Sequence, residues 1–225
     1  MDAARRFYAS ILGDSPSPLN IVKLHEEAVA RGARPHWLGF IDVDDVVRTA
    51  AAFVERGAMP LGPKWVNREG LEAAVLRDPG GAVVAVAKPP TSVGNERNSL
   101  DVAWHLLNTT GVERAKANYG ELFGWEFAEP VDLGTLGVFH PFAWERGGTP
   151  VGSMSAVEGR SGVHPHWLFH FPVSALDPAI SAVRAAGGAV VGPITLPSGE
   201  RIAICDDPQG AAFAVRAPRS PFPSP

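Results

Sequence analysis

The sequence from Pro165 to Pro218 reads PHWLFHFPVSALDPAISAVRAAGGAVVGPITLPSGERIAICDDPQGAAFAVRAP and decides the fold. A related stretch, PHWLGFIDVDDVVRTAAAFVERGAMPLGPKWVNREGLEAAVLRDPGGAVVAVAKPP, runs from Pro35 to Pro90. The tetrapeptide Pro-His-Trp-Leu opens both stretches, and the Asp-Pro pair at 78–79 recurs at 207–208. Two copies of one pattern indicate that the chain is built from repeats of a single supersecondary unit.

Each repeat is predicted to hold one strand, one helix and three further strands. Residues 36–43 predict the first strand, and Asp44 or Asp45 is expected to cap a helix that ends at Gly57. Three short strands follow, and the Asp-Pro-Gly-Gly turn joins the last two. The order is therefore β-α-β-β-β, and it is predicted again around a helix at 112–123.

The first repeat is predicted to be incomplete. The chain opens with a helix expected at residues 2–13, whose Tyr8 corresponds to Tyr119 of the third repeat. Only a short strand predicted at 20–25 follows it before the second repeat, so about three strands are expected to be missing. The predicted organisation is an N-terminal half at 1–90, a polar linker at 91–99, a complete C-terminal half at 100–218 and a tail at 219–225.

Composition excludes several classes of protein. With 225 residues, 45% of them apolar, the chain can bury a core as one domain or two related ones. The net charge of −4 argues against nucleic acid as a partner, and no apolar run is long enough to cross a membrane. The single cysteine, Cys205, excludes an internal disulfide and is expected in a reducing compartment. We predict a cytoplasmic protein.

The sequence resembles the vicinal oxygen chelate superfamily, which includes glyoxalase I, bleomycin-resistance proteins and extradiol dioxygenases, in a tandem form with a truncated first unit. The resemblance rests on the β-α-β-β-β repeats, on AWHLLNTTGVERAKANYGELFGWEF at 103–127, on GTPVGSM at 148–154 and on DPQGAAF at 207–213. It implies an α+β fold in which paired βαβββ units form curved mixed sheets, with two glyoxalase-like halves. It also implies a cup that binds a small molecule.

The resemblance implies positions for a divalent metal, which this chain fills with other residues. Family enzymes place a histidine on the first strand of a unit and a glutamate on its last strand. Those positions are occupied by Leu38, Trp104, Leu168, Ala85 and Ala214. A register shift of one in the third repeat would put His105 in place of Trp104, but one histidine does not make a metal site. Leucine, tryptophan and alanine cannot coordinate such a cation. We therefore predict that the family metal site is missing and that there is no cofactor.

A different metal site is the alternative. His164 and His166 are two residues apart, within reach of one metal if they lie on a strand, and Glu158 could add a carboxylate. His170 shares a face with His166 but lies about 13 Å further along the strand, which is too far. This alternative would be a metal-dependent lyase, isomerase or dioxygenase holding zinc, nickel, manganese or iron.

A ligand pocket is predicted in the C-terminal half. Strand alternation places Trp104 with Leu106 on one face and His166 with His170 on one face. The predicted ligand-binding residues are Trp104, Leu106, Phe139, Trp144, Met154, His166, Leu168 and His170. A wall of aromatic residues with a few imidazoles suits a planar organic ligand, although each aromatic residue could instead fill a core.

We therefore predict a glyoxalase- or bleomycin-resistance-like protein that binds a small hydrophobic or aromatic molecule without the family metal. No catalytic residue is predicted, because carboxylates beside Cys205 should raise its pKa and weaken it as a nucleophile. The incomplete first repeat should leave strand edges that another part of the chain or a homodimer partner covers.

Overall fold

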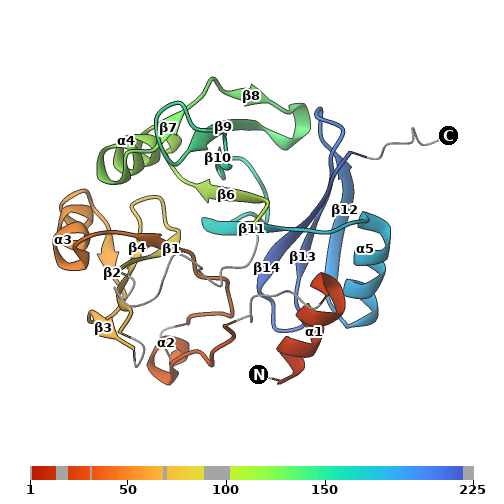
Figure 1. Cartoon of the computed structure of the whole chain (residues 1–225), viewed down its shortest axis with the longest axis horizontal. Coiled ribbons are helices and arrows are strands. Elements are labelled where there is room, and N and C mark those ends of the chain that lie inside the picture. Colours follow the sequence, from red (N-terminus) through yellow and green to blue (C-terminus); the bar gives the residue numbers. More distant parts are fainter. Residues whose placement is uncertain (1, 14–19, 31, 68–69, 89–101, 220–225) are drawn as a thin grey trace. The chain divides into compact units, whose positions relative to one another are not determined.

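The computed structural model describes residues 2–13, 20–30, 32–67, 70–88 and 102–219 (Figure 1). The chain separates into two compact units. The terminal unit contains Met1–Trp37, Asn98–Trp104 and Leu168–Pro225, and the central unit contains Leu38–Arg97 and His105–Trp167. Each unit therefore combines residues from both sides of the predicted linker.

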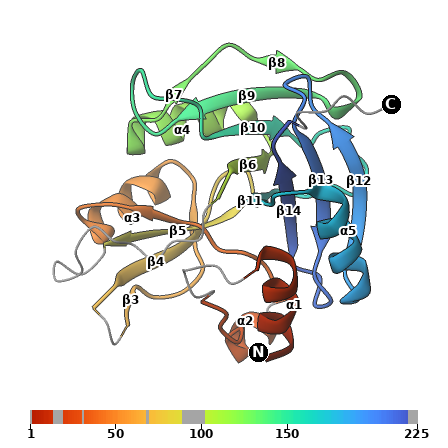
Figure 2. The same ribbon diagram turned by 45° about the vertical axis from the view of Figure 1, so that its right-hand side comes forward.

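The terminal unit packs two helices against a mixed sheet. Its strands follow the order β12-β13-β14-β11, in which β14 and β11 are parallel and the other neighbours are antiparallel. Figure 2 shows α1 beside α5 next to these strands. The bounds are α1 (Asp2–Leu12), α2 (Glu26–Ala30), β11 (His166–Pro172), α5 (Leu176–Ala185), β12 (Ala189–Thr195), β13 (Arg201–Asp206) and β14 (Ala212–Ala217).

The central unit contains the second and third repeats. In the second repeat the strand order is β1-β5-β4-β2, and β3 also pairs with β4. The bounds are β1 (Phe40–Asp42), α3 (Val46–Glu55), β2 (Met59–Pro60), β3 (Trp65–Val66), β4 (Glu72–Arg77) and β5 (Val83–Lys88). Helices α3 and α4 lie side by side within this unit (Figure 1).

The third repeat has the strand order β6-β10-β9-β7, and β8 also pairs with β9. The bounds are β6 (Trp104–Thr109), α4 (Val112–Phe123), β7 (Glu126–Phe127), β8 (Val131–Asp132), a 3-10 turn (Gly134–Leu136), β9 (Val138–Ala143) and β10 (Gly152–Ala156). The predicted α+β class, with helices on mixed sheets, is confirmed.

Local sequence explains where the helices begin and end. Asp45 caps α3, since its carboxylate accepts a hydrogen bond from the amide of Arg48 at 2.9 Å. Helix α4 ends at Gly124, whose φ of 75° is a backbone conformation that glycine adopts without strain. The helix predicted at 112–123 is therefore confirmed at its bounds.

The strand predicted at 20–25 is wrong. Those residues form no strand, and the short helix α2 follows them. Val22 is exposed, and Ile21 and Leu24 are only half-buried, so the segment lacks the buried face that would hold a strand on a sheet. The predicted linker at 91–99 lies outside the described residues, as does the tail from 220 onward.

Within the described ranges, no helix is both long and apolar enough to cross a membrane.

Each unit contains the same buried hydrogen bond between a helix and an Asp-Pro turn. In the terminal unit, the Tyr8 hydroxyl donates to Asp207 Oδ2 at 3.0 Å. In the central unit, the Tyr119 hydroxyl donates to Asp78 Oδ2, also at 3.0 Å. Burial, followed by the neighbouring carboxylate charge, raises the pKa of both tyrosines, so they remain protonated donors. The first repeat thus contributes its helix to the fourth, and the third repeat contributes its helix to the second.

Candidate functional site

The two faces of the terminal-unit sheet have different surroundings. Phe213 on β14 contacts Phe7 of α1, with ring centroids 6.0 Å apart, and Phe171 on β11 contacts Phe213. These residues therefore define the face that packs on the helices. Because side chains alternate along a strand, His170 and Arg216 lie on the opposite face. We call this the open face of the terminal unit because it points away from α1 and α5, although Leu168, His170 and Ala214 on it are buried.

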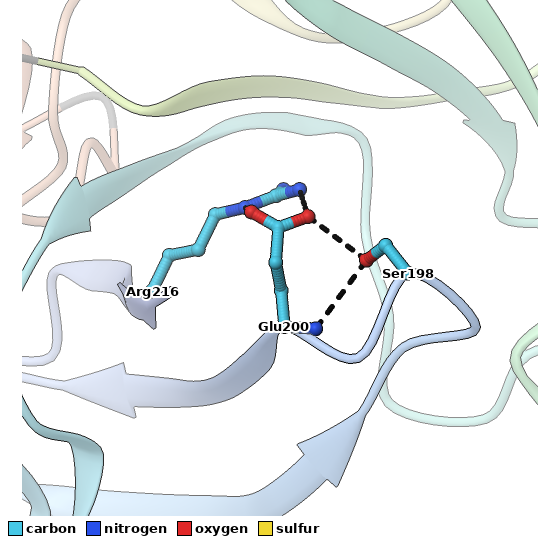
Figure 3. A network of polar contacts seen from close by, with 3 residues as sticks. All are labelled: Ser198, Glu200 and Arg216. Carbon is cyan, nitrogen blue, oxygen red and sulfur yellow. Dashed lines mark hydrogen bonds and ion pairs between the residues drawn. The ribbon is translucent and has the colours of Figure 1, made fainter. Parts of the chain in front are cut away.

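Arg216 is held on the open face by an ion pair with Glu200 (Figure 3). Its Nε and Nη2 donate to the two carboxylate oxygens of Glu200 at 2.8 and 2.6 Å. Ser198 donates from its hydroxyl to the same carboxylate at 2.9 Å. The Arg216 side chain is only 12% exposed and that of Glu200 31%. A two-bond contact of this kind fixes the plane of the guanidinium.

Trp104 lies against the same guanidinium. The Arg216 Cζ atom is 4.9 Å from the centroid of the indole, a cation–π distance. The hydrogen bonds from Arg216 hold the pKa of Glu200 below its ordinary value, so the carboxylate stays ionised and neutralises the arginine. We call Trp104, Ser198, Glu200 and Arg216 the Arg216 cluster.

The rest of the open face is mostly apolar. Strand register places Ile202 opposite Arg216 and Ile204 opposite Ala214, which in turn pairs with the buried His170. The Ala103 amide donates to the His170 carbonyl at 2.8 Å, which holds the residue before Trp104 against β11 within the terminal unit. The open face therefore combines an indole, a neutralised guanidinium and an apolar floor.

Cys205 offers no nucleophile to this face. Burial, and then the charge of Asp206, raises the pKa of its thiol to about 12. The thiol also lies on the strand position between Ile204 and Asp206, so alternation turns it away from the open face.

The predicted ligand-binding residues of the central unit divide between two faces of its sheet. Trp125 stacks on Phe142 of β9 and on Tyr119 of α4, which identifies the helix-facing side. Trp144 contacts Trp125 and His105, and it therefore belongs to this aromatic layer. Trp144 lies two residues after Phe142, so strand alternation places both on this side and Phe139 on the other, although the sequence prediction grouped Phe139 and Trp144 in one pocket.

Met154 also lies on the helix-facing side. It pairs in register with His140 and is fully buried. Leu106 and Phe139 pair with Ser153 and Ser155 respectively, which places them on the other face. The structure thus brings Leu106 and Phe139 to one side of the sheet and Met154 with Trp144 to the other.

The residues of the alternative metal site have other partners. The rings of His164 and His166 stack at 4.7 Å, and His166 Nδ1 lies 2.7 Å from the His164 carbonyl oxygen. Glu158 accepts a hydrogen bond from the Gly111 amide at 2.9 Å, at the start of α4. No group of three or more histidine, cysteine, aspartate or glutamate side chains that could hold a metal occurs in the part of the chain that the structure describes.

Sequence reasoning placed Trp104, Leu168 and His170 near the open face but missed Arg216 and Glu200. Leu168 and His170 are both buried and share a face of β11 by alternation. Arg216 could have been found, because it lies two residues after Ala214 and so must share its face. Glu200 lies directly before β13 and two residues before Ile202, so the same alternation would have placed it on this face, but the sequence prediction did not consider it.

Comparisons with known proteins agree with this architecture. A family model described as "Glyoxalase/Bleomycin resistance protein/Dioxygenase superfamily" matches residues 102–215. The chain is 29% identical over 245 residues to "Putative glyoxylase CFP32" of Mycobacterium bovis and Mycobacterium tuberculosis, covering 96% of this chain and 90% of that protein. It is 33% identical over 154 residues to "Anthracycline biosynthesis protein DnrV" of Streptomyces peucetius, covering 67% of this chain and 54% of that one.

The solved structure of the Mn(II)-bound glyoxalase from Novosphingobium aromaticivorans matches with a TM-score of 0.52 and 9% identity. The match covers 81% of this chain and 63% of the glyoxalase, so this chain spans less than two thirds of that protein. At this identity the likeness concerns the fold alone.

Proposed function

The chain belongs to the glyoxalase/bleomycin resistance protein/dioxygenase superfamily, and from this premise we propose that it binds a planar aromatic molecule on the open face of the terminal unit. The observation that carries the proposal is the Arg216 guanidinium, held between the Glu200 carboxylate and the Trp104 indole. A flat cation and an indole above aliphatic side chains suit the stacking of an aromatic ring.

The charge balance of the Arg216 cluster indicates what charge a ligand should carry. Glu200 neutralises Arg216, so the cluster presents no net charge to a bound molecule. Arg216 uses Nε and Nη2 for Glu200, and its Nη1 hydrogen bonds to no described residue. Nη1 can therefore donate to a carbonyl or hydroxyl oxygen. We infer an uncharged, planar, oxygen-bearing ligand.

The relatives suggest a chemical probe of this kind. The name of DnrV assigns that protein to anthracycline biosynthesis. Anthracycline aglycones are flat, fused-ring quinones that carry several carbonyl and hydroxyl groups and no charged sugar. We propose an aglycone of this class as the test ligand.

We propose that binding needs no metal. The positions that resemblance assigns to metal ligands on the terminal-unit strands hold Leu168 and Ala214, whose side chains have no donor atoms. A metal-dependent reaction receives no specific support from the described residues, because none of their acidic, histidine or cysteine side chains form a group of three.

The proposal is tested by titrating the protein into an anthracycline aglycone and following the fluorescence anisotropy of the ligand. Trp104→Ala should weaken binding about tenfold or more, since it removes the stacking surface, while the melting temperature changes little. Trp65→Ala, which alters a partly exposed tryptophan on β3 of the central unit, is the matched control and should bind as wild type does.

Three outcomes contradict the proposal. They are equal weakening by the two tryptophan variants, no binding by the wild type, and loss of binding when EDTA is added. The last result would favour the metal-dependent alternative.

A further inference from the structure

The central unit carries a second polar cluster that the proposed aromatic site does not use. Arg160 follows β10, and its Nη1 donates to Asn108 Oδ1 at 3.2 Å and to Ser155 Oγ at 3.3 Å. The same nitrogen lies 3.5 Å from the Ala156 carbonyl oxygen. Asn108 is 2% exposed and Ser155 1%. We call Asn108, Ser155 and Arg160 the Arg160 cluster.

The Arg160 cluster lies on the face of the sheet that points away from α4. Asn108 on β6 and Ser155 on β10 are register partners, and Ser155 is also paired with Phe139 on β9. The helix-facing residues Met154 and Phe142 alternate with them along the same strands. The Arg160 guanidinium therefore lies against two buried polar side chains, Asn108 and Ser155, and the aromatic residue Phe139 is next to them on the sheet.

The charge of Arg160 is not neutralised by any described acidic side chain. It takes part in none of the ion pairs found in the described ranges. The nearest acid in sequence, Glu158, is bonded to the Gly111 amide instead. Arg160 is half-buried, and a cation removed from water is costly unless an anion pairs with it.

The geometry of the guanidinium leaves one edge for a ligand. All three of its contacts use Nη1, so Nε and Nη2 donate to none of the described residues. Those two nitrogens form the fork that binds both oxygens of a carboxylate side by side. Asn108 and Ser155 already hold the Nη1 end of the guanidinium in place. Less conformational entropy of the Arg160 side chain is therefore lost when a ligand binds.

We propose that the Arg160 cluster binds the carboxylate of an aromatic acid. Arg160 Nε and Nη2 donate to the two carboxylate oxygens, and the ring of the acid lies toward Phe139. This site differs from the Arg216 cluster in charge, because Glu200 neutralises Arg216 whereas Arg160 keeps a net positive charge. It does not depend on the function proposed for the terminal unit.

The test compares 4-fluorobenzoate with 4-fluorobenzamide, two ligands of the same shape that differ in charge, by fluorine NMR. The wild-type protein should bind the benzoate about tenfold or more tightly than the amide. Arg160→Gln should abolish this preference. Arg160→Lys keeps the charge but loses the fork, so the preference should fall to an intermediate value.

Arg146→Gln is the matched control, since it removes one positive charge from a side chain of the same unit that is 93% exposed. It should leave the preference unchanged. Equal binding of the two ligands, no binding of either, or an equal loss in Arg146→Gln and Arg160→Gln overturns the proposal. If Arg160→Gln does not fold, an Arg160→Lys protein with the full wild-type preference overturns it. Trp104→Ala should leave the benzoate preference intact, which separates this site from the aromatic site.

Discussion

The terminal and central units share their helix-facing side and differ on the other side. In each unit the tryptophan of the repeated Pro-His-Trp-Leu motif meets the buried tyrosine. Trp37 Nε1 donates to the Tyr8 hydroxyl at 3.1 Å, and the Trp167 ring meets the edge of Tyr119 with centroids 5.9 Å apart. The repeated motif thus has a structural role, since it completes a Trp-Tyr-Asp arrangement in both units.

The opposite faces have diverged in charge. The terminal unit presents Arg216 neutralised by Glu200, whereas the central unit presents Arg160 above a serine and an asparagine. A tyrosine buried against an aspartate tolerates few replacements, because either partner left alone would be an unsatisfied buried polar group. The polar groups on the other faces are hydrogen-bonded too, but they differ between the units, and the two proposed sites therefore differ in charge.

The largest expected effect comes from removing the buried carboxylates. Asp207 accepts hydrogen bonds from Tyr8 and from the amides of Gln209 and Ala211, and Asp78 accepts from Tyr119 and the Ala82 amide. Asp207→Ala and Asp78→Ala should each lower the free energy of unfolding by about 3 kcal/mol, because buried donors lose their acceptor.

The measurement is urea denaturation, with Asp206→Ala as the control because Asp206 is the exposed neighbour of Asp207. The control should change stability by less than about 0.5 kcal/mol. If Asp207→Ala lowered the free energy of unfolding strongly and Asp78→Ala only slightly, the two tyrosine–aspartate hydrogen bonds would not be equivalent.

This equivalence was only partly predictable from the sequence. The repeat spacing matched Tyr8 with Tyr119 and the two Asp-Pro turns with each other. Similarity between repeats shows which residues are equivalent, but it does not show which repeat contacts which. The pairing of the first helix with the fourth repeat depends on tertiary packing around Tyr8 and Phe213, and no local pattern encodes it.

The candidate sites were predictable to different degrees. Period-two alternation predicts opposite faces for Trp104 and His105 but left the register of this strand open by one residue; in the structure His105 contacts the aromatic layer and Trp104 contacts Arg216. Alternation is a weaker guide beyond strand ends, and Glu200, Trp144 and Arg160 all lie outside the strands. Arg216 lies on β14, where alternation could have placed it, whereas Glu200 and Arg160 lie outside the strands, so the sequence did not predict the charges of these faces.

A smaller effect is expected from removing only the tyrosine hydroxyls. Tyr8→Phe and Tyr119→Phe keep the ring packing but leave a buried carboxylate oxygen without its donor, at a cost of about 1–2 kcal/mol each. Amide hydrogen exchange should show reduced protection in β13 and β14 for Tyr8→Phe and in β4 and β5 for Tyr119→Phe. Equal loss of protection in both sets of strands for either variant would mean that the two units open together.

The smallest expected effect is a pH dependence that arises from Asp78. Burial raises the pKa of its carboxyl above the ordinary value of 3.8, although hydrogen bonds from Ala82 and Tyr119 act in the opposite direction. The folded state therefore holds this proton more tightly than the unfolded state does. The protonated Asp78 carboxyl contributes its full stabilisation at pH values below the pKa of this group in the unfolded state. This stabilisation is lost as the pH rises through the pKa of Asp78 in the folded state.

Asp78→Asn removes this titration. The free energy of unfolding of the wild type, minus that of Asp78→Asn, should therefore decrease as the pH rises from below about 4 toward neutrality. Asp206→Asn serves as the control for the loss of one negative charge at an exposed site. Denaturation curves at several pH values measure the difference. A difference that grows with pH would mean that the hydrogen bonds from Tyr119 and Ala82 outweigh burial, and that the Asp78 carboxylate is stabilised in its ionised form.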